Sequence, residues 1–183
     1  GLTDEVESDD TVLHITRARI PWLLIGLFGG LIVALMLGEN EGDIESVPAL
    51  ALFMPLIAAM AGNVGVQSSA IVVQALANNK ADHNMTKKLF KELSVGLVNG
   101  LILGAVMLGL GLILGYGQLV TLTVSVSLLA VIIFASLFGT FIPLMLNKFN
   151  VDAALATGPF ITTANDVIGL LIYFQIGRLI IGY

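Results

Sequence analysis

The chain has 183 residues and a net charge of −5; 57% of its residues are hydrophobic and only 11% are charged. A soluble domain has about 25% charged residues, so a lipid bilayer is required as the solvent for this much apolar surface. The absence of cysteine excludes disulfides, thiolate metal sites and thiol nucleophiles. A membrane-spanning helix needs roughly 20 apolar residues. Residues 17–183 are therefore predicted to form one all-α membrane domain of five spans.

Five apolar runs follow one another along the chain, and each is predicted to be a membrane-spanning helix. They cover residues 20–37, 47–77, 93–114, 119–146 and 153–181. In the first run, Pro21 suits an initial helical turn. The second run contains Pro55 and is longer than one straight span needs. In the fifth run, Gly158-Pro159 is expected to disturb the helix, because proline cannot donate to the carbonyl four residues before it.

Glycines at four-residue spacing mark a predicted contact surface on the third span. Gly96, Gly100 and Gly104 lie on one helical face. Small residues at this spacing let two membrane helices approach closely, so we interpret the three glycines as a packing surface.

Basic residues mark one side of the predicted domain. Arg17 and Arg19 precede the first span, four lysines lie between the second and third spans, and Lys148 lies between the fourth and fifth. The positive-inside rule places these segments in the cytoplasm, and five spans then place the C-terminus outside the cell membrane. Residues 1–16 are rich in acids, unlike a signal peptide, and are expected to be a cytoplasmic connecting segment.

The outer loop after the first span carries four acidic residues and no basic one: Glu39, Glu41, Asp43 and Glu45. One interpretation is an acidic vestibule that concentrates cations through its local field. The other is a solvated connector whose acids only mark the outer side. Salt screens the interactions of exposed charges beyond about 10 Å. Screening therefore favours the interpretation as a connector, but both interpretations stay open.

Asp166 is the one formally charged residue inside a predicted span and away from its ends. A carboxylate at the centre of a bilayer costs about 2.5 kcal/mol or more, so we expect it to face water, a partner or an ion. Gly158, Thr162 and Asp166 are four residues apart and share a helical face. All three offer oxygen, the ligand that hard cations prefer. The alternative is a structural carboxylate hydrogen-bonded to a neighbouring Asn or Ser.

The second span carries a further polar cluster. Asn63 and Gln67 are four residues apart, and Gly62 and Gly65 flank Asn63. These glycines are expected to let the helix unwind and expose its carbonyls, as broken helices do at the ion sites of transporters. The alternative is helix packing through small residues, with Asn and Gln forming hydrogen bonds between helices.

No motif predicts an enzyme. The sequence has no HExxH, no GxSxG and no P-loop. A membrane aspartyl protease needs two acids per site, and one chain supplies only Asp166 within its spans. No nucleic-acid partner is expected either.

Two segments about 100 residues apart resemble the membrane domain of the MgtE family of magnesium channels. The first is Pro55-Leu56 leading to GNVGVQS at residues 62–68, and the second is Gly158-Pro159 leading to TTANDVIGLLIY at residues 162–173. The resemblance covers residues 17–183. It differs from the family at Val66, where members often have Asn, so this chain lacks a side-chain amide at that position.

The resemblance implies a homodimer with five transmembrane helices per subunit and a central pore lined by the second and fifth helices. Asp166 matches the family's pore carboxylate. The positions expected to surround the ion, largely through backbone oxygen, are Gly62, Gly65, Gly158 and Thr162. The side chains expected to line the pore are those of Asn63, Gln67, Thr163 and Asn165.

The function implied by the resemblance is passive Mg²⁺ influx, at a site that Mn²⁺ or Ca²⁺ can also occupy. The alternatives are a carrier that couples divalent cations to Na⁺ or H⁺, and a structural membrane anchor. The family also carries a cytoplasmic magnesium-sensing region before the first span, with an N domain and paired CBS modules. That region is not in this sequence, so a truncated form or a short relative is expected.

Overall fold

The computed structural model describes residues 9–78, 84–150, 153 and 158–182. Its α-helices are α1 (Val12–Glu39), α2 (Glu41–Ser46), α3 (Met54–Ala77), α4 (Met85–Ile113), α5 (Gln118–Lys148) and α6 (Pro159–Ile181), and a 3₁₀ helix, η1 (Pro48–Phe53), precedes α3. The described residues contain no strand. Within the described ranges, five helical segments are long and apolar enough to cross a membrane, which confirms the predicted all-α, five-span class.

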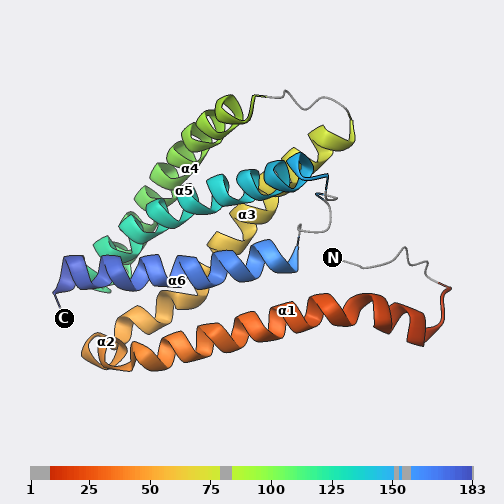
Figure 1. Ribbon diagram of the computed structural model, residues 1–183. Coiled ribbons are helices and arrows are strands. Elements are labelled where there is room, and N and C mark those ends of the chain that lie inside the picture. Colours follow the sequence, from red (N-terminus) through yellow and green to blue (C-terminus); the bar gives the residue numbers. More distant parts are fainter. Residues whose placement is uncertain (1–8, 79–83, 151–152, 154–157, 183) are drawn as a thin grey trace.

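The long helices form an antiparallel bundle with α5 at its centre. α5 packs against α3, α4 and α6, whereas α1 packs mainly against α6 at the edge (Figure 1). In the most apolar window of α5, 56% of the residues are buried, against 6% in α1. Most of the α1 surface is therefore available to lipid or to another chain.

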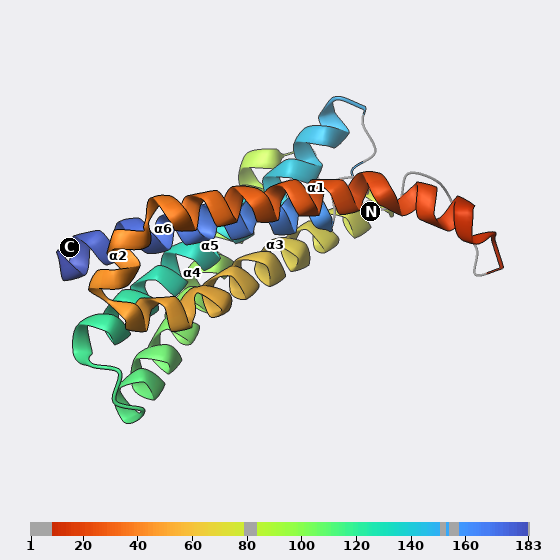
Figure 2. The same ribbon diagram turned by 90° about the horizontal axis from the view of Figure 1, so that it is seen from below.

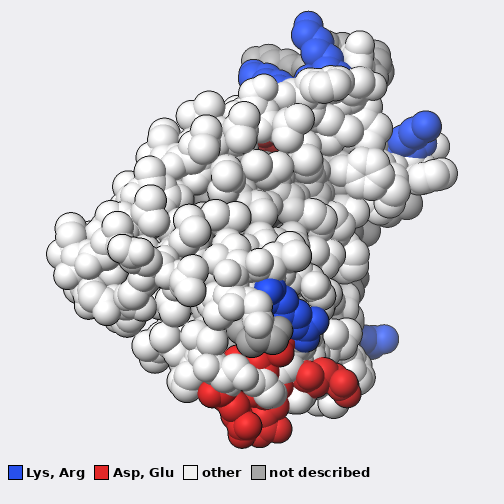
Figure 3. All heavy atoms as spheres, turned by 90° about the vertical axis from the view of Figure 1, so that its left-hand side faces the viewer, with Lys and Arg blue, Asp and Glu red and all other residues white. Residues whose placement is uncertain are grey.

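The start of α1 and the end of α6 lie at opposite ends of the bundle (Figure 1), as an odd number of spans requires. The view from below shows α1 running alongside α6 and extending beyond it near the N-terminus (Figure 2). Acidic side chains gather at the opposite end, near α2 and the C-terminus (Figure 3).

The first helix begins earlier than its apolar run. Thr11 caps α1 by accepting a hydrogen bond from the backbone N–H of His14, and the helix starts at Val12. Pro21 consequently lies inside α1, and its prediction as part of an initial turn is wrong. The turns before Pro21 form because a side-chain cap satisfies the first free backbone donors.

Two other prolines begin helices. Pro55 stands in the first turn of α3 and separates it from η1, so the second run is not a single α-helix. Pro159 is the first residue of α6, after Gly158 with φ 101°. Proline suits this position because the N–H that it lacks would have had no partner within the helix. The fifth helix therefore begins at Pro159 instead of at the predicted start of the run, residue 153, and it is continuous from Pro159 to Ile181.

Close contacts between glycines and neighbouring helices bring the helices of the bundle together. A Cβ built on Gly100 of α4 would lie 3.1 Å from the Leu129 carbonyl oxygen of α5, and Gly96 and Gly104 are buried on the same helix, which confirms the predicted packing surface. Gly139 of α5 meets the backbone of Gly65 in α3. α3 is thus held against α5, and one side of α3 is left for α6 and the pocket described below.

Candidate functional site

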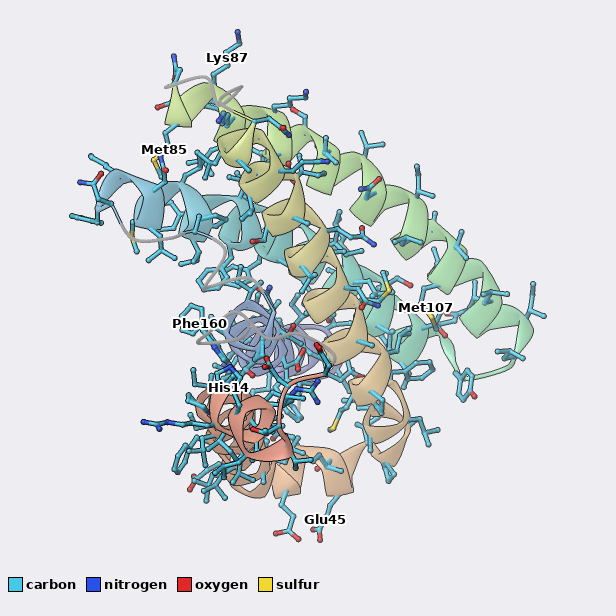
Figure 4. All side chains as sticks on the ribbon, turned by 90° about the vertical axis from the view of Figure 1, so that its right-hand side faces the viewer. His14, Glu45, Met85, Lys87, Met107 and Phe160 are labelled. Carbon is cyan, nitrogen blue, oxygen red and sulfur yellow. The ribbon has the colours of Figure 1, made fainter. Side chains whose placement is uncertain are left out.

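A pocket of about 300 Å³ opens between α3 and α6. Its walls are formed by Ala58, Ala59, Gly62, Asn63, Val66, Gln67, Thr162 and Asp166. Five residues selected from the sequence therefore surround one space: Gly62, Asn63, Gln67, Thr162 and Asp166. In Figure 4, Phe160 marks the first turn of α6, which lies between α1 and α3.

The Asp166 carboxylate lies across Gly62, where α3 has no side chain. A Cβ built on Gly62 would lie 3.2 Å from Asp166 Oδ1 and 3.0 Å from Thr162 Cγ2. Asp166 is half-buried, and within the described parts of the chain no hydrogen bond or ion pair engages its carboxylate. The carboxylate is thus available to a ligand in the pocket, and the alternative of an Asn or Ser partner finds no support.

The wall formed by α3 is a regular helix. α3 is continuous from Met54 to Ala77, so the expected unwinding at Gly62 and Gly65 is wrong. Gly62 instead leaves space for the side chains of Thr162 and Asp166, and the side chain of Asn165 packs directly against Gly65. The polar groups that α3 offers to the pocket are therefore the exposed side chains of Asn63 and Gln67.

Thr163 and Asn165 lie outside this pocket. Thr163 faces α1, where a Cβ built on Gly29 would lie 3.0 Å from Thr163 Cβ. Asn165 is completely buried beside Gly65, and its amide nitrogen and oxygen have no hydrogen-bond partner in the described regions.

Gly65 and Gly158 are also absent from the pocket lining. Gly65 is buried between α5 and α6, beside Gly139 and Asn165. Gly158 caps α6, and its carbonyl oxygen accepts a hydrogen bond from the Thr162 backbone N–H at 3.0 Å. Within one chain, both positions serve helix contacts or helix initiation.

The acidic outer segment has a basic neighbour that the sequence interpretation did not pair with it. Arg178 Nε donates to Asp43 Oδ2 at 2.8 Å, and an Arg178 terminal nitrogen donates to Asn40 Oδ1 at 2.6 Å. The expectation that no basic residue offsets these acids is therefore wrong for Asp43. Figure 3 shows a basic side chain beside the acidic group at this end, while Glu39, Glu41 and Glu45 are exposed.

A second polar contact also escaped the sequence interpretation. The buried Ser68 hydroxyl of α3 donates to Glu92 Oε1 of α4. The only signal in the sequence was the position of Glu92 immediately before the third apolar run, and this position does not indicate a partner. Ser68 follows Gln67 in sequence but is absent from the lining of the pocket.

The fold and the pocket together define a class. The described residues contain five helices apolar enough to span a membrane, and two of them, α3 and α6, form a pocket that holds the Asp166 carboxylate, a hydroxyl and two side-chain amides. Oxygen ligands of this kind suit hard cations. The molecule is therefore a polytopic membrane protein with a candidate cation site.

The model of the MgtE family, described as a divalent cation transporter, matches residues 54–176, and the chain belongs to this family. Both walls of the pocket lie within the matched segment. The resemblance inferred from the two motifs is thereby confirmed.

Three relatives named "Magnesium transporter MgtE" are similar to the chain over most of its length. The protein of Bacillus subtilis is 36% identical over 169 residues, which cover 91% of this chain and 38% of the relative. The protein of Thermus thermophilus is 35% identical, over 97% of this chain and 40% of the relative. The protein of Enterococcus faecalis is 34% identical, over 98% of this chain and 40% of the relative. The chain thus spans 38–40% of the length of these relatives, and none of the three names describes an enzyme.

Proposed function

We propose that the chain is the permeation unit of a magnesium transporter, in which Mg²⁺ passes inward through a pore between two copies of the chain. α3 and α6 line this pore, and Asp166 provides the charge that attracts the ion. The observation that carries the proposal is the unpaired Asp166 carboxylate in a pocket with Thr162, Asn63 and Gln67. The names of the three relatives supply the identity of the ion.

The size of the pocket supports the passage of a hydrated ion. Mg²⁺ gives up its waters reluctantly and usually keeps several of them when it binds to a protein. Six waters at about 30 Å³ each occupy about 180 Å³, which is less than the pocket volume of about 300 Å³. The side chains of Thr162, Asn63 and Gln67 can then hydrogen-bond to the water shell while Asp166 offsets the charge.

The open side of the pocket supports a dimer. Asn63 and Gln67 are exposed halfway along α3, where a lipid neighbour could not satisfy their amides and leaving them unsatisfied would be costly. A second copy related by a twofold axis would cover this face, since such an interface presents the same surface twice. Two Asp166 carboxylates would then face one ion path. Their mutual repulsion when the path is empty favours the binding of a dication.

The distribution of charge supports one orientation in the cell membrane. Lys87, Lys88 and Lys91 lie at the start of α4 and Lys148 lies at the end of α5, so the positive-inside rule puts this end in the cytoplasm. The N-terminus is then cytoplasmic and the C-terminus is outside. The exposed acids Glu39, Glu41 and Glu45 face outward and raise the local concentration of cations.

Uptake of Mg²⁺ by proteoliposomes tests the role of Asp166. Asp166→Asn keeps the size of the side chain and removes its charge. Hydrogen bonds to charged groups contribute about 1.5–3 kcal/mol, so uptake should fall by about tenfold to a hundredfold. Glu45→Gln removes one charge from an exposed position and should retain most of the activity. Unchanged uptake by a folded Asp166→Asn protein would refute the assignment.

The same assay separates a channel from a coupled carrier. A channel should show uptake that follows the Mg²⁺ gradient and the membrane potential, and that is unchanged when a Na⁺ or proton gradient is imposed at constant potential. Stimulation by either gradient would establish a carrier, and no uptake under any gradient would leave only an anchor. Anomalous scattering from Mn²⁺ near Asp166 in a crystal of the dimer would locate the ion independently.

A further inference from the structure

Arg178 joins three helices at the end of the molecule that carries α2. It belongs to the last turn of α6, binds Asp43 of α2 and binds Asn40, the residue at the corner between α1 and α2. We propose that Arg178 is a positioning residue: the clamp of Arg178, Asp43 and Asn40 fixes α1 and α2 to α6 and thereby holds Asp166 in the pocket. This inference rests on the ion-facing role of Asp166 proposed above.

The clamp is completed by a second hydrogen bond of Asn40. Asn40 is buried, and its Nδ2 donates to the Met36 carbonyl oxygen at 2.7 Å while its Oδ1 accepts from Arg178. The guanidinium also lies at the C-terminal ends of α1 and α6, where the helix dipoles favour a positive charge. Removal of Arg178 would therefore leave a buried amide oxygen and two helix ends without their cationic partner.

α1 has little else to hold it in place. Its main packing partner is α6, and only Ala18, Gly29 and Met36 are buried along its length. It is tied to α6 by the fit of Thr163 against Gly29, by the clamp at the far end, and by Met36, which belongs to the apolar cluster that contains Tyr173 and Phe174 of α6. Loss of the clamp would leave the outer part of α1 held mainly by apolar contacts.

The two faces of α6 connect the clamp to the pocket. Thr162 and Thr163 are consecutive and point about 100° apart around the helix. Thr163 meets α1 at Gly29, whereas Thr162 and Asp166 meet α3 at Gly62. A rotation of α6 by about 10° moves an atom about 5–6 Å from the helix axis by about 1 Å. A loosened α1 would therefore let the Asp166 carboxylate leave its position in the pocket.

Binding of Mn²⁺ to the purified chain, together with Mg²⁺ uptake, tests the clamp. Substitutions remote from a ligand change its binding by about two- to thirtyfold, and we expect weaker Mn²⁺ binding within this range for Arg178→Gln and Asp43→Asn. Gly42→Ala is the matched control, because it alters the same short helix next to Asp43 and nothing lies within 4 Å of a Cβ built there. This control should bind Mn²⁺ within twofold of wild type.

Rescue distinguishes positioning from general stability. Arg178→Lys keeps the charge but lacks the fork that reaches both Asp43 and Asn40, so its Mn²⁺ affinity should lie between those of wild type and Arg178→Gln. The exchange of Asp43→Arg with Arg178→Asp should bind Mn²⁺ more tightly than either single variant, because contacting residues are energetically coupled. If Arg178→Gln fails to fold, Asp43→Asn and the exchanged pair decide the question.

Three outcomes would overturn the clamp. The first is equal weakening of Mn²⁺ binding by Asp43→Asn and Gly42→Ala, which would show a general effect of altering α2. The second is wild-type Mn²⁺ affinity in a folded Arg178→Gln protein. The third is no recovery of Mn²⁺ affinity in the exchanged pair. The Asp166→Asn variant distinguishes failure of the clamp from failure of the proposed function. Wild-type Mn²⁺ affinity in Asp166→Asn would refute the ion site itself. Weaker Mn²⁺ binding in Asp166→Asn together with wild-type Mn²⁺ binding in Arg178→Gln would refute only the clamp.

Discussion

Gly139 of α5 lies directly against the backbone of Gly65 in α3, so a methyl group at Gly139 is a sharp test of the bundle. A Cβ built there would overlap the Gly65 carbonyl oxygen and lie 3.0 Å from its Cα and carbonyl carbon. Carbon atoms pack best at about 3.5–4.0 Å, so the two helices must separate by about 0.5–1 Å. A gap of this size forfeits about a quarter to a half of each dispersion contact across it.

We expect Gly139→Ala to lower the free energy of unfolding by about 1–3 kcal/mol, the usual cost of overpacking, although alanine favours the helix by up to about 1 kcal/mol. The melting temperature in detergent, followed by circular dichroism, should fall by about 3–10 °C. Gly109→Ala in α4 is the matched control, because nothing lies within 4 Å of a Cβ there, and it should melt at or slightly above the wild-type temperature. A Gly139→Ala protein that melts no lower than wild type would refute the contact.

Three further predictions address hydrogen bonds and the acidic end. Tyr173→Phe removes the hydroxyl that donates to the Leu50 carbonyl at 2.9 Å; it should cost about 1–3 kcal/mol in thermal unfolding, and an unchanged melting temperature would contradict this. Asn165→Leu should be at least as stable as wild type, because its buried amide has no partner in the described regions; a lower melting temperature would reveal a ligand of the amide. Glu41→Gln combined with Glu45→Gln should slow Mg²⁺ uptake at about 0.01 M salt but not at about 1 M salt, because the Debye length falls from about 30 Å to about 3 Å. Equal slowing of uptake at both salt concentrations would exclude a field effect.

The five spans were predictable because apolar runs of this length have few alternatives. The pairing of Thr162 with Asp166 was also predictable, since residues four apart share a helical face, and the two do line one pocket. The ends of the helices were less predictable from the sequence, because proline is found in the first turn of a helix and also, occasionally, in its interior. Pro21 falls inside α1 because Thr11 caps the helix well before it.

The sequence could not predict which neighbouring helix each helix face contacts. Gly62 and Gly65 fit an unwound helix and a close helix contact equally well, and only the position of α6 decides between them. Asn165 differs from Asp166 by one residue, yet the turn of about 100° between them buries Asn165 beside Gly65. Arg178 and Asp43 are 135 residues apart, so their pairing depends on the assembled bundle.

The thin attachment of α1 has a practical consequence. Its apolar run, residues 20–37, extends for about 27 Å at about 1.5 Å per residue, against about 30 Å of hydrocarbon in a typical bilayer. A run that is no longer than the hydrocarbon is accommodated in a thicker bilayer by local thinning or by flanking side chains that reach toward the interface, and α1 packs on the helix that carries Asp166. Acyl-chain length is therefore a variable of the proposed ion site, and uptake rates of two variants are comparable only in bilayers of the same thickness.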